Sequence, residues 1–376
     1  MAKLVKPAKR QPSSDQEKAQ DSLLHKSIYV GGRKRKLPAW LPPLGLTIIT
    51  LLIIFWLLPR LLADPAREEA EEPVASQTAL QDQDATQPAP VFQRGDRALI
   101  RVGECPLFDQ AQVKAQRISS ALFNEQVEVL EVKNNWVRVR LADGLEAWLD
   151  GQNLTKDATM WEKKARDRKA MVLAPYKRIM SHAINGYPIL QAPMGTLLYP
   201  DHQVGDVLSL PLSDGQTGWT NKNDLIFLTS GDLPPIPDKA NALFVSSAMN
   251  FYQASYIPGG MSKDGADMAG AIYIAARVNG LALPRDLTAQ AKLGREVETI
   301  KDVTTGLIRP QLLEPGDVAF FHAPDNPRKI TQAAILLEEG QALCRLDNDS
   351  TLNIRDLNRQ EDLLSRLVTV RRYFAD

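Results

Sequence analysis

A glycine-punctuated loop that runs straight into an amphipathic helix constrains this chain more than any other segment. The loop spans residues 258–266, and its glycines at 259, 260 and 265 allow positive φ and close backbone approach. Asp267 is a good N-cap, and apolar residues follow with helical spacing at positions 268, 271, 272, 275 and 278. We therefore predict a helix that begins after Asp267 and stops at Asn279-Gly280.

The residues that open this helix, Asp267-Met268-Ala269-Gly270, resemble the active site of the NlpC family of bacterial cell-wall cysteine peptidases. In that family an Asp-Cys-Ser-Gly segment opens the helix that carries the nucleophile. The positive end of a helix lowers the pKa of a cysteine thiol there, whereas a methionine thioether cannot ionise. The resemblance implies that Met268 stands at the nucleophile position without the reactive group.

The resemblance extends over most of residues 233–376. The segment 313–321 matches the family's turn into its first core strand, and the next strand in the family begins with the catalytic histidine. Gln332 stands at that position here. Further along, where a second polar residue orients the base, the chain has Cys344. The resemblance thus predicts a papain-like α+β domain whose three catalytic positions, Met268, Gln332 and Cys344, are all degenerate.

Cys344 is the one thiol in the sequence of this domain, so it is the candidate for a displaced nucleophile. Free cysteines mostly behave as small buried hydrophobes, and we interpret Cys344 in that way. A disulfide between Cys105 and Cys344 stays open, because the bacterial periplasm is oxidising, although this bond would have to join two domains.

The resemblance also implies a ligand site around the start of the helix. In relatives that carry SH3-like domains, the aspartate before the nucleophile recognises the free amino end of the peptidoglycan stem peptide. Asp267 either binds an ammonium group in this way or serves only as the N-cap, and both interpretations stay open. Arg285 resembles a further family position or is a packing arginine. The expected ligand-binding residues are Asp267, Gly259, Gly260, Ala269 and Gly270.

Two stretches in the middle of the chain share one pattern. Asp143-Gly144 is followed by Trp148 and Leu154, and Asp214-Gly215 is followed by Trp219 and Leu225. Each stretch follows an alternating segment that is typical of a half-buried strand entering a tight turn. The pattern resembles the bacterial SH3-like domain, which often accompanies NlpC peptidase domains and helps to hold murein. We predict two small SH3-like β-barrels, at 93–158 and 166–232, with both tryptophans in their cores.

An uncharged apolar run at residues 41–58 separates a basic segment from an acidic one. Residues 1–38 carry ten Lys or Arg and three acidic residues, whereas residues 61–90 carry seven acidic residues and one Arg. The run is long for a buried core helix, and no small-residue cleavage pattern of a signal peptide follows it. We predict a basic cytoplasmic tail at 1–38, a transmembrane helix at 39–63 and a flexible acidic linker at 64–92.

Composition and motifs exclude several classes of function. The chain has 45 Lys plus Arg and 45 Asp plus Glu, so no net charge draws it to nucleic acid. Its four histidines have no zinc-ligand spacing, and no phosphate-binding glycine motif is present. We therefore expect no metal, no cofactor and no nucleic-acid partner.

Together these features predict a single-pass protein of the bacterial inner membrane, with its N-terminus in the cytoplasm and its C-terminal domains in the periplasm. The fold class is multidomain: one transmembrane helix, two SH3-like all-β barrels and an α+β papain-like domain of the NlpC type at 233–376. We expect a catalytically inactive peptidase homologue that binds peptidoglycan peptides or a cell-envelope partner. Two alternatives stay open: an active γ-D-glutamyl-diamino-acid cysteine endopeptidase with an unusual nucleophile, and a structural scaffold that acts through its SH3-like domains.

The charge asymmetry around residues 41–58 generates a prediction about topology. A reporter fused after Asp376 should be active only outside the cytoplasm, because the basic flank of the apolar run lies on its N-terminal side. Alkaline phosphatase and a cytoplasm-dependent fluorescent protein, fused at the same position, give opposite readouts. Phosphatase-negative, fluorescent cells would overturn the predicted orientation.

Overall fold

The computed structural model describes residues 91–156 and 168–374. The predicted basic tail at 1–38, the transmembrane helix at 39–63 and nearly all of the linker at 64–92 lie outside the described residues. Among the helices of the described ranges, none has the length and apolar character needed to cross a membrane.

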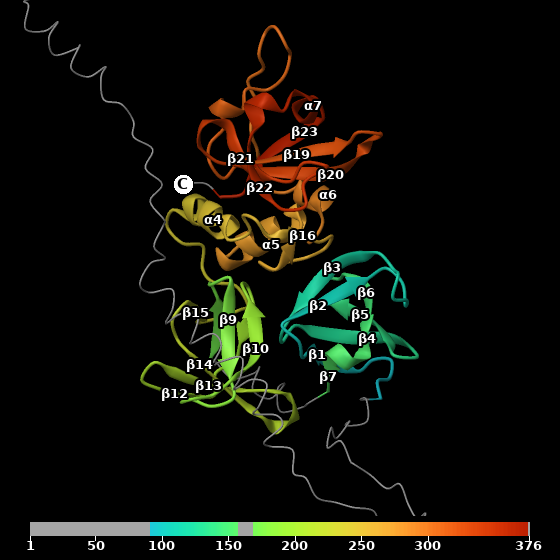
Figure 1. Cartoon of the computed structure of the whole chain (residues 1–376), viewed down its shortest axis with the longest axis vertical. Coiled ribbons are helices and arrows are strands. Elements are labelled where there is room, and N and C mark those ends of the chain that lie inside the picture. Colours follow the sequence, from blue (N-terminus) through green and yellow to red (C-terminus); the bar gives the residue numbers. More distant parts are fainter. Residues whose placement is uncertain (1–90, 157–167, 375–376) are drawn as a thin grey trace, which may run out of the picture. The chain divides into compact units, whose positions relative to one another are not determined.

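The first β domain is a single antiparallel sheet with the strand order β3-β2-β6-β5-β4-β1-β7. Alternating apolar residues from these strands fill one core, around which the sheet curls in Figure 1. The turn between β5 and β6 is the first copy of the repeat, and Gly144 takes a φ of +86° there. The elements are β1 (Arg97–Ile100), β2 (Glu104–Phe108), β3 (Arg117–Leu122), β4 (Gln126–Lys133), β5 (Trp136–Leu141), β6 (Glu146–Asp150), the 3-10 helix η1 (Gly151–Asn153) and β7 (Leu154–Thr155).

The second β domain contains two sheets. A sheet of five strands has the order β10-β9-β14-β13-β12, and a sheet of three has the order β11-β8-β15. The second copy of the repeat is the β13–β14 hairpin, whose turn is a short 3-10 helix. The elements are β8 (Lys169–Val172), β9 (Tyr176–Met180), β10 (Pro188–Pro193), β11 (Leu197–Leu198), β12 (His202–Val204), β13 (Val207–Pro211), η2 (Ser213–Gly215), β14 (Thr217–Asn221) and β15 (Leu225–Leu228).

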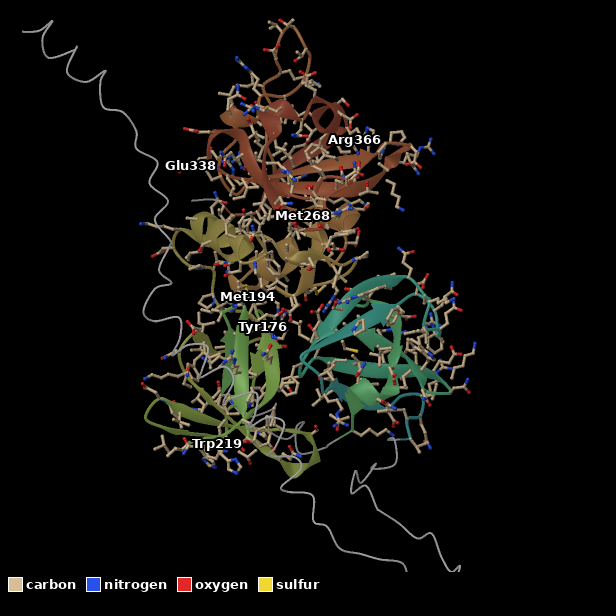
Figure 2. All side chains as sticks on the ribbon, viewed as in Figure 1. Tyr176, Met194, Trp219, Met268, Glu338 and Arg366 are labelled. Carbon is tan, nitrogen blue, oxygen red and sulfur yellow. The ribbon has the colours of Figure 1, made fainter. Side chains whose placement is uncertain are left out.

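The placement of the two repeat tryptophans in the cores was wrong. Successive side chains of a strand point to opposite faces, and the residue before each tryptophan is the one that is buried. Ala147 takes the core position in β6, and Gly218 takes it in β14, where an added Cβ would lie 2.4 Å from Ile179 Cγ2. Trp148 and Trp219 therefore lie half-buried on the outer faces of their sheets. Figure 2 marks Trp219 on the second β domain.

The C-terminal domain is built on a six-stranded sheet with the order β18-β23-β19-β20-β21-β22. Helices α4 and α5 cover one face, and α7 packs on the opposite face (Figure 1). The elements are α4 (Ala240–Met249), β16 (Ser255–Tyr256), β17 (Gly265–Ala266), α5 (Met268–Val278), α6 (Leu287–Gln290), β18 (Arg295–Glu296), η3 (Pro310–Leu312), β19 (Val318–Ala323), β20 (Asn326–Leu336), η4 (Glu338–Gly340), β21 (Gln341–Cys344), β22 (Asn353–Asp356), η5 (Leu357–Arg359), α7 (Glu361–Ser365) and β23 (Leu367–Arg372).

Helix α5 confirms the prediction made from its cap and periodicity. It begins at Met268 after the N-cap Asp267, ends at Val278, and Gly280 follows with a φ of +88°. Every residue of the helix except Arg277 is buried. A helix that is apolar all round must be covered on every side, and the apolar cluster around α5 contains residues from all three domains.

The loop glycines act in two different ways. Gly259 alone among the three has a positive φ, of +66°. Gly260 and Gly265 are needed because of close approach: a Cβ on Gly260 would lie 2.3 Å from the carbonyl oxygen of Gly265, and one on Gly265 would lie 2.2 Å from Ile257 Cδ1. The three glycines thus divide the two expected properties, with positive φ at Gly259 and close approach at Gly260 and Gly265.

Arg285 joins the C-terminal domain to the first β domain. Its Nη2 donates hydrogen bonds to Glu125 at 3.0 and 3.2 Å, its Nε donates to Asp143, and its Nη1 donates to the Ser120 carbonyl at 2.5 Å. The guanidinium also lies over the Tyr273 ring of α5, with 4.8 Å from Cζ to the ring centroid. With only 8% of its side chain exposed, Arg285 is neither a surface arginine nor a simple packing residue.

Substitution of Arg285 should weaken the interface between the C-terminal domain and the first β domain. Arg285→Gln leaves Glu125 and Asp143 without their cation, and we expect the free energy of unfolding to fall by about 3 kcal/mol. The matched control is Arg140→Gln, because Arg140 also pairs with two carboxylates but is 45% exposed. The control should leave the urea midpoint nearly unchanged, because solvent screens an exposed ion pair. Urea unfolding followed by tryptophan fluorescence measures the stability of both variants. Equal losses of stability would contradict a special role of Arg285 between the two domains.

Candidate functional site

A cleft of about 450 Å³ lies where the start of α5 faces the sheet of the C-terminal domain. Met268 sits at this place in Figure 2, with β20 and the end of β21 forming the other side. The first β domain adds residues 116–118, around the start of β3, to the wall. The cleft is therefore shared by two domains.

Polar groups of the first β domain hold the loop that precedes α5. Ser120 Oγ lies 2.6 Å from the Gly259 carbonyl oxygen, to which it can donate its proton. Glu104 Oε1 accepts hydrogen bonds from the Met261 N–H at 3.0 Å and from Arg117 Nη2 at 2.6 Å. A loop fixed at both of these points keeps one wall of the cleft in place.

Asp267 is the N-cap of α5 and also ties the loop to the helix. Its Oδ1 accepts from the Gly270 N–H at 2.8 Å, and its Oδ2 accepts from the Gly259 N–H at 2.7 Å. Burial raises the pKa of this carboxyl above its ordinary value, against the two N–H donors that lower it. Asparagine has one acceptor oxygen instead of two, so it cannot replace both bonds. Asp267 also lines the cleft, which brings the cap and a ligand-facing group together in one residue.

The remaining predicted ligand residues surround Asp267. Gly259 and Ala269 line the cleft, whereas Gly260 and Gly270 lie beneath it as packing positions. A Cβ on Gly270 would lie 2.0 Å from the Gly260 carbonyl oxygen, so the two glycines let the loop cross the helix closely. Their role is to shape the site rather than to touch a ligand.

Met268 fills the position at the helix N-terminus where a nucleophile would stand. Its side chain is 5% exposed and belongs to the apolar cluster that also contains Ala333 and Ile335 of β20. A thioether has no labile proton and no anionic form at any pH. The residue therefore packs against the sheet and supplies no nucleophile.

Gln332 lies opposite, on β20, and is oriented by a residue that the sequence analysis did not find. Its Nε2 donates to Asp347 Oδ1 at 2.6 Å, and Oδ2 of the same carboxylate lies 3.7 Å from Arg366 Nη2. The side chain is 7% exposed, and Oε1 has no hydrogen-bond partner among the described residues. Asp347, not Cys344, is thus the third polar group of the constellation. Asp347 could not be predicted from the sequence, because the length of β21 determines which of the residues after it lies beside Gln332 of β20.

Cys344 faces away from the cleft. It lies on β21 with 1% of its surface exposed, in the core on the opposite side of the sheet from Met268. Burial raises the pKa of its thiol to about 12. Cys105 lies in the separate core of the first β domain, and both cysteines are free. The disulfide between them is not formed, and neither thiol reaches the cleft.

Among residues 91–156 and 168–374, no three His, Cys, Asp or Glu side chains gather in a way that would hold a metal ion. Asp267, Gln332 and the basic residues that line the cleft offer hydrogen bonds and charge to a ligand.

Comparison with family models and known proteins places these features. Residues 107–155 match the bacterial SH3 domain, and residues 253–372 match the NlpC/P60 family. The chain therefore carries a bacterial SH3 domain and an NlpC/P60 domain, which confirms the predicted NlpC-type domain and the first of the two predicted SH3-like domains. These matches locate the cleft within the second of the two domains and its wall of residues 116–118 within the first.

Two matches in Bacillus cereus, one found by sequence and one by structure, cover most of the described chain. One, named gamma-D-glutamyl-L-lysine dipeptidyl-peptidase, is 24% identical over 251 residues, which cover 64% of this chain and 70% of that protein. The other is the crystal structure of an NlpC/P60 family protein, with a TM-score of 0.63 at 20% identity over 74% of this chain and 100% of that chain. The second similarity is one of fold.

Because Asp347 orients Gln332, substitutions at positions 268 and 332 can test whether these positions have the geometry of a nucleophile and a base. Met268→Cys alone places a thiol at the helix N-terminus without a base, whereas Met268→Cys with Gln332→His adds an imidazole beside the Asp347 carboxylate. We expect iodoacetamide at pH 7 to alkylate the double variant about tenfold faster than the single one, because an imidazolium partner increases the thiolate fraction. Asp347→Asn in the double variant should remove most of the gain. Equal alkylation rates in the single and double variants would rule out this geometry.

Proposed function

We propose that this chain is a catalytically inactive relative of the NlpC/P60 peptidases that binds a peptidoglycan peptide in its cleft without cleaving it. The observation that carries the proposal is the pair Met268 and Gln332, a thioether and an amide on the two walls of a formed cleft. Neither side chain can act as a nucleophile or take a proton at neutral pH. The chain therefore has neither the nucleophile nor the base of a cysteine peptidase at these two positions.

Binding need not be lost with the chemistry. Groups that position a substrate in its ground state are separable from those that stabilise the transition state. The loop with Gly259, the carboxylate of Asp267 and the wall from the first β domain are all in place around Met268. They support a cleft that still receives a peptide.

An active peptidase with a displaced nucleophile is less well supported. Such an enzyme needs an accessible thiol near a base, and Cys344 is buried on the far side of the sheet with a raised pKa. A scaffold that acts through its β domains remains the second candidate, since Trp148 and Trp219 lie on outer faces where a partner can reach them.

We further propose that the second β domain is also SH3-like and that residues 39–63 anchor the chain in the bacterial inner membrane. The repeat of Asp-Gly and Trp in the β5–β6 and β13–β14 hairpins supports the first point, and the uncharged run at 41–58 supports the second. The basic tail would remain in the cytoplasm and the β domains and cleft would face the periplasm, close to the cell wall.

The ligand that we propose is a stem peptide with a γ-D-glutamyl linkage and a free amino end. The linkage is suggested by the name of the 24% identical relative, and the amino end by the Asp267 carboxylate in the cleft. An ammonium group near a partly buried carboxylate is worth about 1.5–3 kcal/mol, or roughly ten- to a hundredfold in affinity.

Calorimetric titration with L-Ala-γ-D-Glu-L-Lys tests this function. The full-length protein should bind the tripeptide and leave it intact after prolonged incubation, and acetylation of the amino end should weaken binding at least about tenfold. Only the ionised carboxyl attracts the ammonium group, so affinity should fall as pH decreases through the raised pKa of Asp267, starting above its ordinary 3.8. Hydrolysis of the tripeptide, or equal affinity for the acetylated form, would contradict the proposal.

A further inference from the structure

The side of the cleft formed by the sheet carries positive charge that no carboxylate of the described residues neutralises. Lys329 of β20 and Arg345, which follows β21, both line the cleft on the side of Gln332. Within the described part of the chain, Lys329 is exposed and has no carboxylate oxygen within ion-pair distance of its Nζ. The ammonium group is therefore free to meet a ligand.

Arg345 is fixed in place without losing its charge. Its Nε donates to the Asp349 carbonyl at 2.9 Å and its Nη2 donates to the Asp347 carbonyl at 2.7 Å. The guanidinium is stacked on Tyr256, with 3.8 Å from Cζ to the ring centroid. Backbone carbonyls and a ring hold the plane of the group, while Nη1 has no partner among the described residues. A fixed planar guanidinium with a free edge is suited to a carboxylate.

The other basic residues of the cleft are paired with carboxylates, unlike Lys329 and Arg345. Arg117 lies 2.6 Å from Glu104, and Arg285 is paired with Glu125 and Asp143. The nearby acids are likewise engaged. Asp286 caps α6 through the Ala289 N–H at 2.8 Å, and Asp349 pairs with Arg355 at 2.6 Å. Asp347 holds Gln332 and faces Arg366. The unneutralised charge is thus confined to Lys329 and Arg345.

We propose that Lys329 and Arg345 form a carboxylate subsite, so that the cleft selects peptides with a free carboxylate beyond their amino-terminal residue. This inference rests on the proposed function, because it assigns the far end of the same peptide. Asp267 takes the amino group and the two cationic side chains take the carboxylate, so that together they orient the peptide in the cleft. In L-Ala-γ-D-Glu-L-Lys the carboxylate comes from one of two sources, the α-carboxyl of the glutamyl residue or the terminal carboxyl of lysine.

Binding of three peptides by the full-length protein separates these sources. The tripeptide is compared with one analogue whose glutamyl α-carboxyl is a carboxamide and another whose terminal carboxyl is a carboxamide. One of the two analogues should bind at least about tenfold more weakly than the parent, since a charge-assisted hydrogen bond is lost. The analogue that binds weakly identifies the carboxylate in the subsite.

Variants assign the selectivity to the two basic residues. Lys329→Gln should bind the parent peptide about tenfold more weakly and discriminate less between the peptides, and Arg345→Lys, which keeps the charge but not the planar fork, should lose part of the discrimination. Arg328→Gln is the matched control, because Arg328 is the exposed neighbour of Lys329 on β20 and does not line the cleft. It should bind all three peptides as the unmodified protein does.

The outcomes distinguish the subsite from the function on which it rests. Equal affinity of the unmodified protein for the parent and both carboxamides would overturn the subsite and leave peptide binding intact. Binding of no peptide would overturn both proposals. Discrimination that survives unchanged in Lys329→Gln and Arg345→Lys would place the carboxylate elsewhere and also overturn the subsite.

Discussion

The cleft depends on one buried arginine that belongs to one domain and finds its counter-charges in another. A guanidinium taken out of water is unfavourable unless charged and polar partners replace the lost hydration. Arg285 meets this condition through Glu125, Asp143 and the Ser120 carbonyl, all in the first β domain. The same β2–β3 region then holds the loop through Ser120 and Glu104. The wall of the cleft and the clamp between the domains are therefore one set of contacts.

The cleft is lined by both uncharged and charged side chains. Met268 and Gln332, a thioether and an amide, both line the cleft. Charged groups also line the cleft: the Asp267 carboxylate, and the cationic side chains of Lys329 on β20 and of Arg345 after β21. Under the proposed function, this arrangement of charges would orient a peptide in the cleft without cleaving it.

Local features of the sequence predicted the fold better than the site. Helix α5 was predicted within a residue because its cap and spacing are properties of adjacent residues. The two tryptophans lie outside the cores because strand alternation places Ala147 and Gly218 inside instead. Asp347 and the partners of Arg285 were not predicted, because contacts such as Arg285 to Glu125 join residues 160 positions apart and leave no periodic trace.

The partners of Arg285 in the first β domain lie 142 to 165 residues before it in the sequence, so they are synthesised well before it. Residues 120–143 of the first β domain leave the ribosome long before Arg285 does, and domains generally fold as units during synthesis. Until Arg285 arrives, Glu125 and Asp143 remain hydrated on the surface of an already folded domain. Contacts between residues so far apart in sequence form late and slowly. Competence to bind would thus be acquired in the last step of maturation, when the domains dock and the wall of the cleft closes.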